Sequence, residues 1–280
     1  MCRYLKKMKN VYGRIYNYFP LTFILPNEYS RFIDTFMHQD YKKCVWICKP
    51  SASSRGRGIY LLSGISELNY STQVVVQRYL PDPYLIGGYK WDLRIYVLVT
   101  SVCPLRIYIY NEGLCRFSTE KFDMAGIDNM FSHLTNTSIN KHAPNVHTNK
   151  SVVGTGSKWS LAQLKAHLES KNKNWDMLWF KIKLIAMTTF INMPSSVPDY
   201  SHCFELFGID IIVDSKLKPW LLEVNCEPAL SVDGYVDQVL KPQLIRDTIQ
   251  ALEFKDYAQW VKQEEDNRFQ SKYQRSHYFR

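Results

Sequence analysis

The sequence predicts an α+β fold, in which antiparallel strands pair in hairpins and helices occupy separate stretches of the chain. The first observation is the stretch from Phe204 to Asp233, where two apolar runs flank the polar segment from Asp214 to Pro219. Both runs are rich in β-branched and aromatic residues, which is typical of a β-hairpin. The second observation is that other strand-like runs precede this stretch, interspersed with stretches whose apolar residues recur at helical spacing.

Acidic and amide side chains recur on one face of the predicted hairpin. Alternate residues of a strand point to the same side, so Glu223 and Asn225 share a face. We place Val213 opposite Trp220, which sets Asp210 opposite Glu223 with Cβ atoms roughly 4.5–5.5 Å apart. Two close carboxylates repel each other unless a cation lies between them, and oxygen ligands without His or Cys favour Mg²⁺. The alternative is a solvated edge hairpin whose acids face water.

Composition favours a folded protein with an acidic partner. The chain has 280 residues, of which 46% are hydrophobic and 14% aromatic, so it can bury a core and is not globally disordered. The formal net charge of +9 suits nucleic acid, anionic lipid or an acidic protein tail, or is ordinary solubility charge. No recognisable nucleic-acid module is present, so we expect no nucleic-acid partner.

The length of the apolar runs and the spacing of the cysteines argue against membrane insertion and against a zinc site. No apolar run approaches the roughly 18 residues that a membrane span needs, and the N-terminal residues lack the apolar core of a signal peptide. The seven cysteines are scattered, without the spacing of a zinc site. We therefore expect reduced thiols in a cytosolic protein.

The first third of the chain predicts a helix and several strands. Residues 28–38 have apolar side chains at helical spacing and predict a short amphipathic helix. Strands are expected at residues 44–50 and 59–64, joined by the small, glycine-rich segment SASSRGRG. Such a loop lets backbone N–H groups close over phosphates, and Lys49 stands at its root. The alternative is a mobile hairpin turn.

The middle of the chain predicts a long strand with an unusual start. A strand at residues 74–80 is closed by Pro81-Asp82-Pro83, which predicts a hinge or domain boundary. In the next strand, at residues 89–100, Lys90, Asp92 and Arg94 alternate onto one face. That row either lines a nucleotide cleft or is a self-neutralised cross-strand ladder.

The remaining stretches predict one more hairpin and three helices. We expect a hairpin between residues 105–110 and 114–118 that turns at residues 111–113 and brings Arg116 into the same sheet. Residues 133–141 read as a loop, and Ser160 is expected to cap a helix. A longer helix at residues 175–193 should bury its Met and aromatic side chains. A closing helix is expected at residues 236–257, followed by a charged tail.

Together these pieces resemble the tubulin–tyrosine ligase-like family, whose catalytic core is an ATP-grasp fold, and are most similar to its polyglutamylase branch. The matching motifs run in the family's order over about three quarters of the chain. They are KPSASSRGRGIYL at residues 49–61, QRYL at 77–80, YKWDLRIYVLVT at 89–100, EGLCRF at 112–117, HLTNTSINK at 133–141, FELFGIDIIVD at 204–214 and LKPWLLEVN at 217–225.

The resemblance implies a role for each site residue. Two sets of residues would hold ATP. The triphosphate would be held by Lys49, Arg55, Gly56, Arg57 and Gly58. The rest of the nucleotide would be held by Gln77, Arg78, Tyr79, Leu80, Lys90, Asp92 and Asn136. The implied Mg²⁺ ligands are Asp210, Glu223 and Asn225, in agreement with the face argument above. Arg116 and Lys141 resemble the groups that hold the incoming amino acid, and the expected catalytic residues are Arg116, Lys141 and Glu223.

The resemblance also implies a domain plan. Residues 1–81 correspond to part of the ATP-grasp central domain, with the family's N-terminal domain apparently missing. Residues 82–257 correspond to the C-terminal ATP-grasp domain with its metal site, an antiparallel sheet with flanking helices. Residues 258–280 form the expected charged tail.

The activity that this implies is ATP- and Mg²⁺-dependent addition of free L-glutamate to glutamate side chains in the acidic tails of tubulin, through an acylphosphate. We expect the protein in the cytoplasm on microtubules, including those of the cilium or basal body. The alternatives are a tubulin glycylase, which shares most motifs, and a catalytically silent microtubule-binding scaffold.

Overall fold

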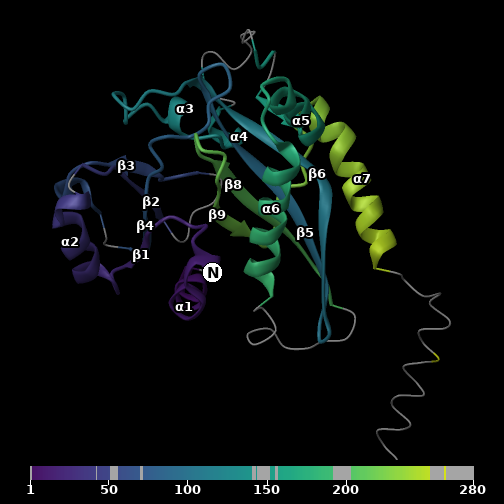
Figure 1. Cartoon of the computed structure of the whole chain (residues 1–280), viewed down its shortest axis with the longest axis horizontal. Coiled ribbons are helices and arrows are strands. Elements are labelled where there is room, and N and C mark those ends of the chain that lie inside the picture. The colour runs from purple at the N-terminus through teal and green to yellow at the C-terminus, as the bar shows by residue number, and fades with distance from the viewer. Residues whose placement is uncertain are drawn as a thin grey trace, which may run out of the picture. The chain divides into compact units, whose positions relative to one another are not determined.

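The structure is a computed structural model that describes residues 2–41, 43–50, 56–69, 72–140, 143, 152–154, 157–191, 203–252 and 262. The chain divides into two compact units, Met1–Ser231 and Val232–Arg280. The first unit contains two antiparallel sheets together with separate helices, so the α+β prediction is confirmed (Figure 1). None of the helices in the described ranges is long and apolar enough to cross a membrane.

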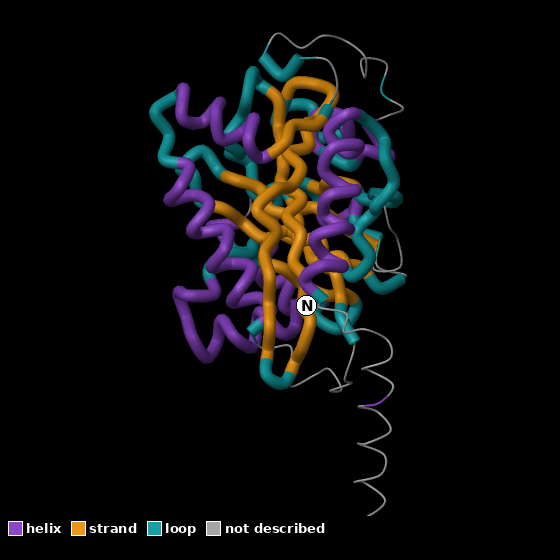
Figure 2. Tube along the Cα trace, turned by 90° about the vertical axis from the view of Figure 1, so that its right-hand side faces the viewer, coloured by secondary structure: helices purple, strands orange, loops and turns teal. Residues whose placement is uncertain are grey.

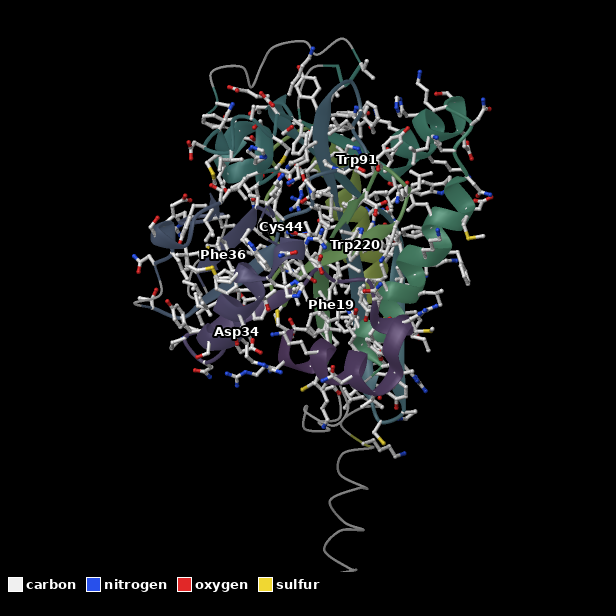
Figure 3. All side chains as sticks on the ribbon, turned by 60° about the vertical axis from the view of Figure 1, so that its left-hand side comes forward. Phe19, Asp34, Phe36, Cys44, Trp91 and Trp220 are labelled. Carbon is white, nitrogen blue, oxygen red and sulfur yellow. The ribbon has the colours of Figure 1, made fainter. Side chains whose placement is uncertain are left out.

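A small sheet lies near the N-terminus, with strand order β1-β4-β2-β3. Its strands are β1 (Thr22–Leu25), β2 (Trp46–Pro50), β3 (Tyr60–Leu62) and β4 (Val74–Arg78). The predicted amphipathic helix is confirmed as α2 (Tyr29–Met37), and it buries Phe32 edge-on against Trp46 with ring centroids 5.1 Å apart. Figure 3 shows Phe36 and Cys44 on this side of the molecule and Trp91 on the large sheet.

A large sheet follows, with strand order β7-β6-β5-β8-β9. Its strands are β5 (Tyr89–Val102), β6 (Leu105–Lys121), β7 (Lys158–Ser160), β8 (Glu205–Val213) and β9 (Pro219–Asn225). Trp91, Leu93 and Ile95 are buried in one cluster with residues of α5 (Leu161–Ser170) and α6 (Trp175–Phe190). In Figure 2 these helices lie along the left side of the strands. The other face of β5 is therefore the face that carries the polar row.

The helices differ from the predictions in several places. Residues 133–141 are not simply a loop, because α3 (Met130–His133) ends there and α4 (Thr137–Asn140) follows. Ser160 caps α5 as predicted, and its hydroxyl accepts a hydrogen bond of 3.2 Å from Gln163 N. The sequence patterns missed α1 (Cys2–Tyr12), β1, β7 and the short 3₁₀ turns Gly13–Tyr16, Gln39–Tyr41 and Ile65–Glu67.

Two predicted helices need adjustment. The prediction that α6 buries its Met and aromatic side chains is wrong in part, because Trp175 and Phe190 are buried whereas Met177, Phe180 and Met187 are about half exposed. In the second unit, α7 (Tyr235–Ala251) confirms the closing helix up to Ala251. The rest of that helix and nearly all of the predicted tail lie outside the described residues.

The predicted hairpin across residues 111–113 is wrong. Strand β6 runs through this stretch without turning, and the connection to β5 is instead made at Cys103 and Pro104. Ile95 pairs with Gly113 whereas Val97 pairs with Ile109, so β6 accommodates extra residues as a bulge. Asn and Gly are common in turns, but pairing with β5 on both sides keeps this stretch in the sheet.

The Pro81-Asp82-Pro83 segment connects the small sheet to the large one. It is held against the turn between β8 and β9, since Ser215 N donates to Asp82 O at 3.0 Å and Tyr84 N donates to Val213 O at 2.9 Å. Pro83 and Asp214 also form an isolated bridge. The domain boundary that we predict at residue 81 coincides with this connection and stays a prediction.

We predict that Gly113→Ala destabilises the fold. A Cβ at residue 113 would lie 2.5 Å from the carbonyl oxygen of Arg94, a backbone atom of the central strand. The sheet must shift to admit it, so the free energy of unfolding in urea should fall by about 1–3 kcal/mol. Gly126→Ala is the control, because a Cβ there meets nothing within 4 Å. Equal stability of the two variants would contradict the prediction.

Candidate functional site

A pocket lies between the two sheets, and both contribute to its walls. From the small sheet come residues on β2 and β4, and from the large sheet come residues on β5, β8 and β9. The full lining is Ile47, Lys49, Ile59, Gln77, Arg78, Tyr79, Leu80, Lys90, Asp92, His133, Leu134, Thr135, Asn136, Asp210, Ile212, Leu222 and Glu223. Most of the residues that the sequence predicts to bind nucleotide are therefore brought together here.

The alternation predicted for β5 is confirmed, and its polar row faces buried partners. Asp92 is 5% exposed and Lys90 is 7% exposed. Asp92 receives two hydrogen bonds from the Arg116 guanidinium, at 2.7 and 2.6 Å, and one from Thr135 Oγ1 at 2.7 Å. Arg94 pairs instead with Asp210, at 2.5 and 3.1 Å. Asp92 and Arg94 are thus neutralised by cross-strand pairs to β6 and β8, as the ladder alternative has it, while Lys90 and Asp92 also line the pocket.

Lys90 is a buried cation whose hydrogen bonds go to neutral groups. Its Nζ donates to Tyr79 Oη at 2.8 Å and to His133 O at 2.7 Å. His133 Nε2 lies 3.1 Å from the carbonyl oxygen of Gly126, so this nitrogen carries the proton and Nδ1 accepts from Tyr79 Oη at 2.9 Å. Burial lowers the pKa of Lys90 to about 7, with Asp92 opposing the shift and Lys49 adding to it. A bound anion would favour the charged lysine.

The structure confirms the predicted carboxylate pair in the β8–β9 hairpin, although the strand register at the turn differs from the predicted one. Asp210 pairs with Glu223 as predicted, but Val213 lies opposite Pro219 and not opposite Trp220. A register shift next to Asp210 restores the expected pairing further along the strands. The predicted spacing was right at the acids because a one-residue bulge compensates for a one-residue error at the turn.

Two arginines surround the first of these acids. Arg116 Nη2 lies 2.9 Å from Asp210 Oδ2, in addition to the bidentate pair that Arg94 makes with the same carboxylate. Burial by itself would raise the pKa of Asp210, but Arg116 and Arg94 outweigh it and hold the pKa well below its ordinary value. Asp210 is therefore a permanent buried anion at the centre of the large sheet.

Glu223 is the other carboxylate of the pair, and its surroundings stabilise its negative charge less than those of Asp210 do. Its Oε1 accepts a hydrogen bond of 3.1 Å from Asn225 Nδ2. Burial, and then the charge of Asp210, raise the pKa of Glu223 above its ordinary value. A divalent cation beside it would relieve that repulsion.

The donor set suits Mg²⁺ on chemical grounds. Within the described residues no three His, Cys, Asp or Glu side chains gather as a metal site. Mg²⁺ needs no such cage, because it is usually held by one or two carboxylates together with substrate phosphates and water. Asp210, Glu223 and the side-chain oxygen of Asn225 offer hard oxygen ligands only. These three residues fit the ion that the sequence predicts there.

The small sheet presents a second cation to the pocket. Lys49, near the end of β2, donates a hydrogen bond of 3.0 Å to Gln77 Oε1 on β4. Gln77 is almost fully buried and its Nε2 donates to Thr22 Oγ1 at 3.0 Å. This chain fixes the side-chain amide of Gln77 and, through it, the direction in which Lys49 points.

The glycine-rich loop uses its glycines for backbone conformation. Gly56 and Gly58 have φ values of +77° and +70°, in the left-handed region that other residues rarely adopt. A Cβ at Gly56 would lie 2.6 Å from Ile139 Cδ1 and 3.1 Å from the side chain of Asn136. The loop therefore passes close to α4, which brings Gly56 and Asn136 together. Arg57 is exposed.

Some predicted residues differ from the expectation. Arg78 is among the lining residues but is exposed, with its guanidinium 5.7 Å from the ring centroid of Tyr41. Arg55 and Lys141 are outside the described residues. The site also holds His133 and Thr135, which the sequence patterns did not single out, although both belong to the HLTNTSINK motif, which predicts a loop. Their roles depend on contacts with Tyr79 and Asp92, which lie far away in the chain.

Comparison with known proteins decides the family. The model of the tubulin-tyrosine ligase family matches residues 1–266. The chain belongs to the tubulin-tyrosine ligase family. The resemblance seen in the sequence motifs is thereby confirmed.

Its relatives in this family carry polyglutamylase names. The chain is 44% identical over 254 residues to the human "Probable tubulin polyglutamylase TTLL2", covering 89% of this chain and 43% of that protein. It is 41% identical over 271 residues to the Tetrahymena thermophila "Probable beta-tubulin polyglutamylase", covering 90% of this chain and 22% of the relative. It is 37% identical over 261 residues to the human "Tubulin polyglutamylase TTLL5", covering 89% of this chain and 20% of that protein. The chain thus spans less than half the length of these relatives.

We predict that Lys90→Met flattens the pH dependence of stability. Because the pKa of Lys90 falls from 10.5 to about 7 on folding, the unfolded chain holds an extra proton between these values, so stability rises with pH across that window. The contribution of Lys90 to the slope should approach about 1.4 kcal/mol per pH unit. The buried thiol of Cys48, whose pKa burial raises to about 11, acts in the opposite direction at the alkaline end of the window. Urea unfolding at several pH values from 7 to 10 measures it.

Lys165→Met, at a half-exposed lysine of α5, is the control. The wild-type slope should persist in this variant, whereas in Lys90→Met it should fall by the contribution of Lys90. If Lys90→Met keeps the wild-type slope, Lys90 is not the group that loses its proton on folding.

Proposed function

We propose that this protein is an ATP-dependent ligase of ATP-grasp architecture that adds glutamate to glutamate side chains in the acidic tail of tubulin. The observation that carries the proposal is the pocket between the two sheets, which is lined by Lys49 of the small sheet and by Lys90, Asp210 and Glu223 of the large sheet. Cations for phosphates and carboxylates for a magnesium ion are the two requirements of a nucleotide-triphosphate site. Membership of the family and the names of the relatives support the same activity.

In this proposal the apolar part of the pocket receives the adenine ring. Ile47, Leu80 and Leu222 supply apolar surface, and the backbone around Tyr79 and Leu80 lies beside them. The triphosphate runs toward Lys49 and the loop of Gly56 to Gly58, whose backbone N–H groups and flanking arginines complement negative charge. Lys90 becomes fully charged when a phosphate group lies against it.

Asp210, Glu223 and Asn225 would hold Mg²⁺. The ion, when bound, neutralises charge on the phosphate oxygens during phosphoryl transfer. The role of this chain is to place the ligands: Arg94 and Arg116 keep Asp210 ionised, and Asn225 orients Glu223 through its hydrogen bond.

The proposed reaction needs no nucleophilic side chain. A glutamate carboxylate of the tubulin tail attacks the γ-phosphorus of ATP, which yields an acylphosphate and ADP. The amine of free glutamate then attacks the acyl carbon, phosphate leaves, and an isopeptide bond forms with loss of a proton from the amine. The protein contributes positioning and charge neutralisation. Arg116 and Lys141 are the residues that we assign to the incoming glutamate.

Partners and location follow from this activity. The formal net charge of +9 would steer an acidic tail toward the protein, and the attraction should weaken as salt is added. We place the protein on microtubules in the cytoplasm, including those of the cilium or basal body.

The proposal is tested by incubating the chain with tubulin, Mg²⁺–ATP and labelled amino acids. We expect ATP-dependent incorporation of glutamate into the tubulin tails. Incorporation of glycine instead would identify a glycylase. No incorporation, with a melting temperature unchanged by saturating Mg²⁺–ATP, would favour a silent scaffold and overturn the proposal.

We predict that Glu223→Gln abolishes ligase activity while the fold is retained. The substitution leaves a single carboxylate for Mg²⁺ and relieves a buried repulsion, so thermal stability should not fall. Asp210→Asn should lose activity too, but with lower stability, because two arginines lose their charged partner. Glu205→Gln, at an exposed acid of the same strand β8, should keep wild-type activity. An active Glu223→Gln enzyme at ordinary Mg²⁺ would remove the proposed metal site.

A separate prediction concerns Arg116. The assignment of Arg116 to the incoming glutamate comes from the family resemblance, since its guanidinium is engaged with Asp92 and Asp210 and Arg116 is not among the residues that line the pocket. On that assignment Arg116→Ala should raise the apparent KM for glutamate, and it should also lower stability by about 3–5 kcal/mol, since Asp92 and Asp210 stay buried. Activity is therefore measured well below the melting temperature. Arg106→Ala, at an exposed arginine of the same strand, is the control. Lower stability with an unchanged KM for glutamate would confine Arg116 to a structural role, and the assignment would be withdrawn.

A further inference from the structure

Helix α6 lies over one face of the large sheet (Figure 1). Its side chains that are not packed against that sheet include an exposed apolar stripe. Its inner face buries Leu178, Ile182 and Ile185 in the core. The residues of the outer stripe recur at alternating spacings of three and four, which is the seam pattern of a coiled coil. They are Met177, Phe180, Leu184, Met187 and Ile191, with exposed fractions of 50%, 52%, 38%, 45% and 51%.

The stripe is too regular and too long to be scattered surface hydrophobicity. Contiguous apolar patches on a soluble surface mark sites of interaction. The end of the stripe also adjoins the 3₁₀ turn after α1, since Tyr16 Oη donates to Thr188 O at 3.2 Å, and that turn exposes Ile15.

Lysines flank the stripe. At 100° per residue, Lys181 projects on one side of the stripe and Lys183 on the other, and both are exposed. In the described part of the chain neither lysine takes part in an ion pair. The acid of α6 is Asp176, in the first turn, where it favours the helix dipole. Over its remaining length the stripe combines apolar side chains with positive charge alone.

These features select one kind of partner. A narrow seam of alternating spacings fits the apolar stripe of another helix, and flanking lysines pair best with acids at the flanking positions of that helix. A second copy of this chain offers lysines there, and an antiparallel pair centred on Leu184 would set Lys183 near its own counterpart. We propose that the outer face of α6 docks an amphipathic helix with acidic flanks from a separate polypeptide chain.

The site is independent of the proposed ligase activity. The nucleotide pocket uses the face of β5 that carries Lys90 and Asp92, whereas α6 packs against the opposite face through Trp91 and Leu93. Failure of the docking proposal would leave the ligase proposal untouched, and the reverse also holds.

The first experiment measures binding of two synthetic helices to the whole chain. Both have leucine at the seam positions, and one carries glutamate and the other lysine at the flanking positions. We expect the glutamate peptide to bind at least about tenfold more tightly by fluorescence anisotropy. Phe180→Glu should abolish binding, and Lys181→Glu with Lys183→Glu should reverse the preference. Tyr108→Glu, at a half-exposed aromatic residue of β6, is the control for added charge. Equal binding of the two peptides, or binding that survives Phe180→Glu, overturns the proposal.

The second experiment identifies the natural occupant. A photoreactive amino acid replaces Phe180 in cells, and the crosslinked peptide is sequenced. A helix-forming segment of another protein, with acids beside its apolar seam, supports the proposal. A crosslink to this same polypeptide, or self-association in sedimentation that Phe180→Glu prevents, overturns it. Binding to anionic vesicles that Phe180→Glu abolishes, without a peptide crosslink, also overturns it in favour of a membrane surface.

Discussion

The polar side of the large sheet depends on one buried ion network. Asp92 on β5 and Asp210 on β8 are both nearly inaccessible to water, and Arg116 on β6 bridges them while Arg94 adds a second pair to Asp210. Burying either acid without these arginines would be costly, since a charge removed from water needs a partner of opposite sign. The network therefore links the three central strands through their side chains as well as through their backbones.

The two faces of β5 have different roles, since one packs into the core and the other lines the pocket. One face supplies the apolar side chains that pack against α5 and α6, and the other supplies the charged row that meets the small sheet across the pocket. Because side chains alternate along a strand, a single strand can bear half of the core and half of the site. The attachment of residues 82–84 to the β8–β9 turn ties the connection between the sheets to the hairpin that carries the acidic pair.

The pocket and the outer face of α6 would bind partners of different chemistry. The pocket already contains balanced charges at Asp92 and Asp210, while Lys49, Lys90 and Glu223 remain for a ligand to complete. The outer face of α6 is a different surface, which is apolar and positively charged. The chain that carries it spans less than half the length of its named relatives. A ligand in the pocket and a helix on α6 would satisfy different physical demands.

The sequence by itself determined the α+β class and the strand alternation that sets Lys90, Asp92 and Arg94 on one face. Both follow from short-range periodicity, which the chain carries locally. The pairing of Asp210 with Glu223 depends in addition on a bulge that the sequence pattern does not show. Only the tertiary structure decided that β6 bulges between Ile109 and Gly113, because pairing with β5 on both sides overrides the preference of this stretch for a turn. The roles of Arg94, Arg116, His133 and Thr135 were likewise decided by partners 24 to 116 residues away in the chain. The outer face of α6 belongs to the same group, since apolar spacing is alike on the two sides of that helix and only packing tells which side is buried.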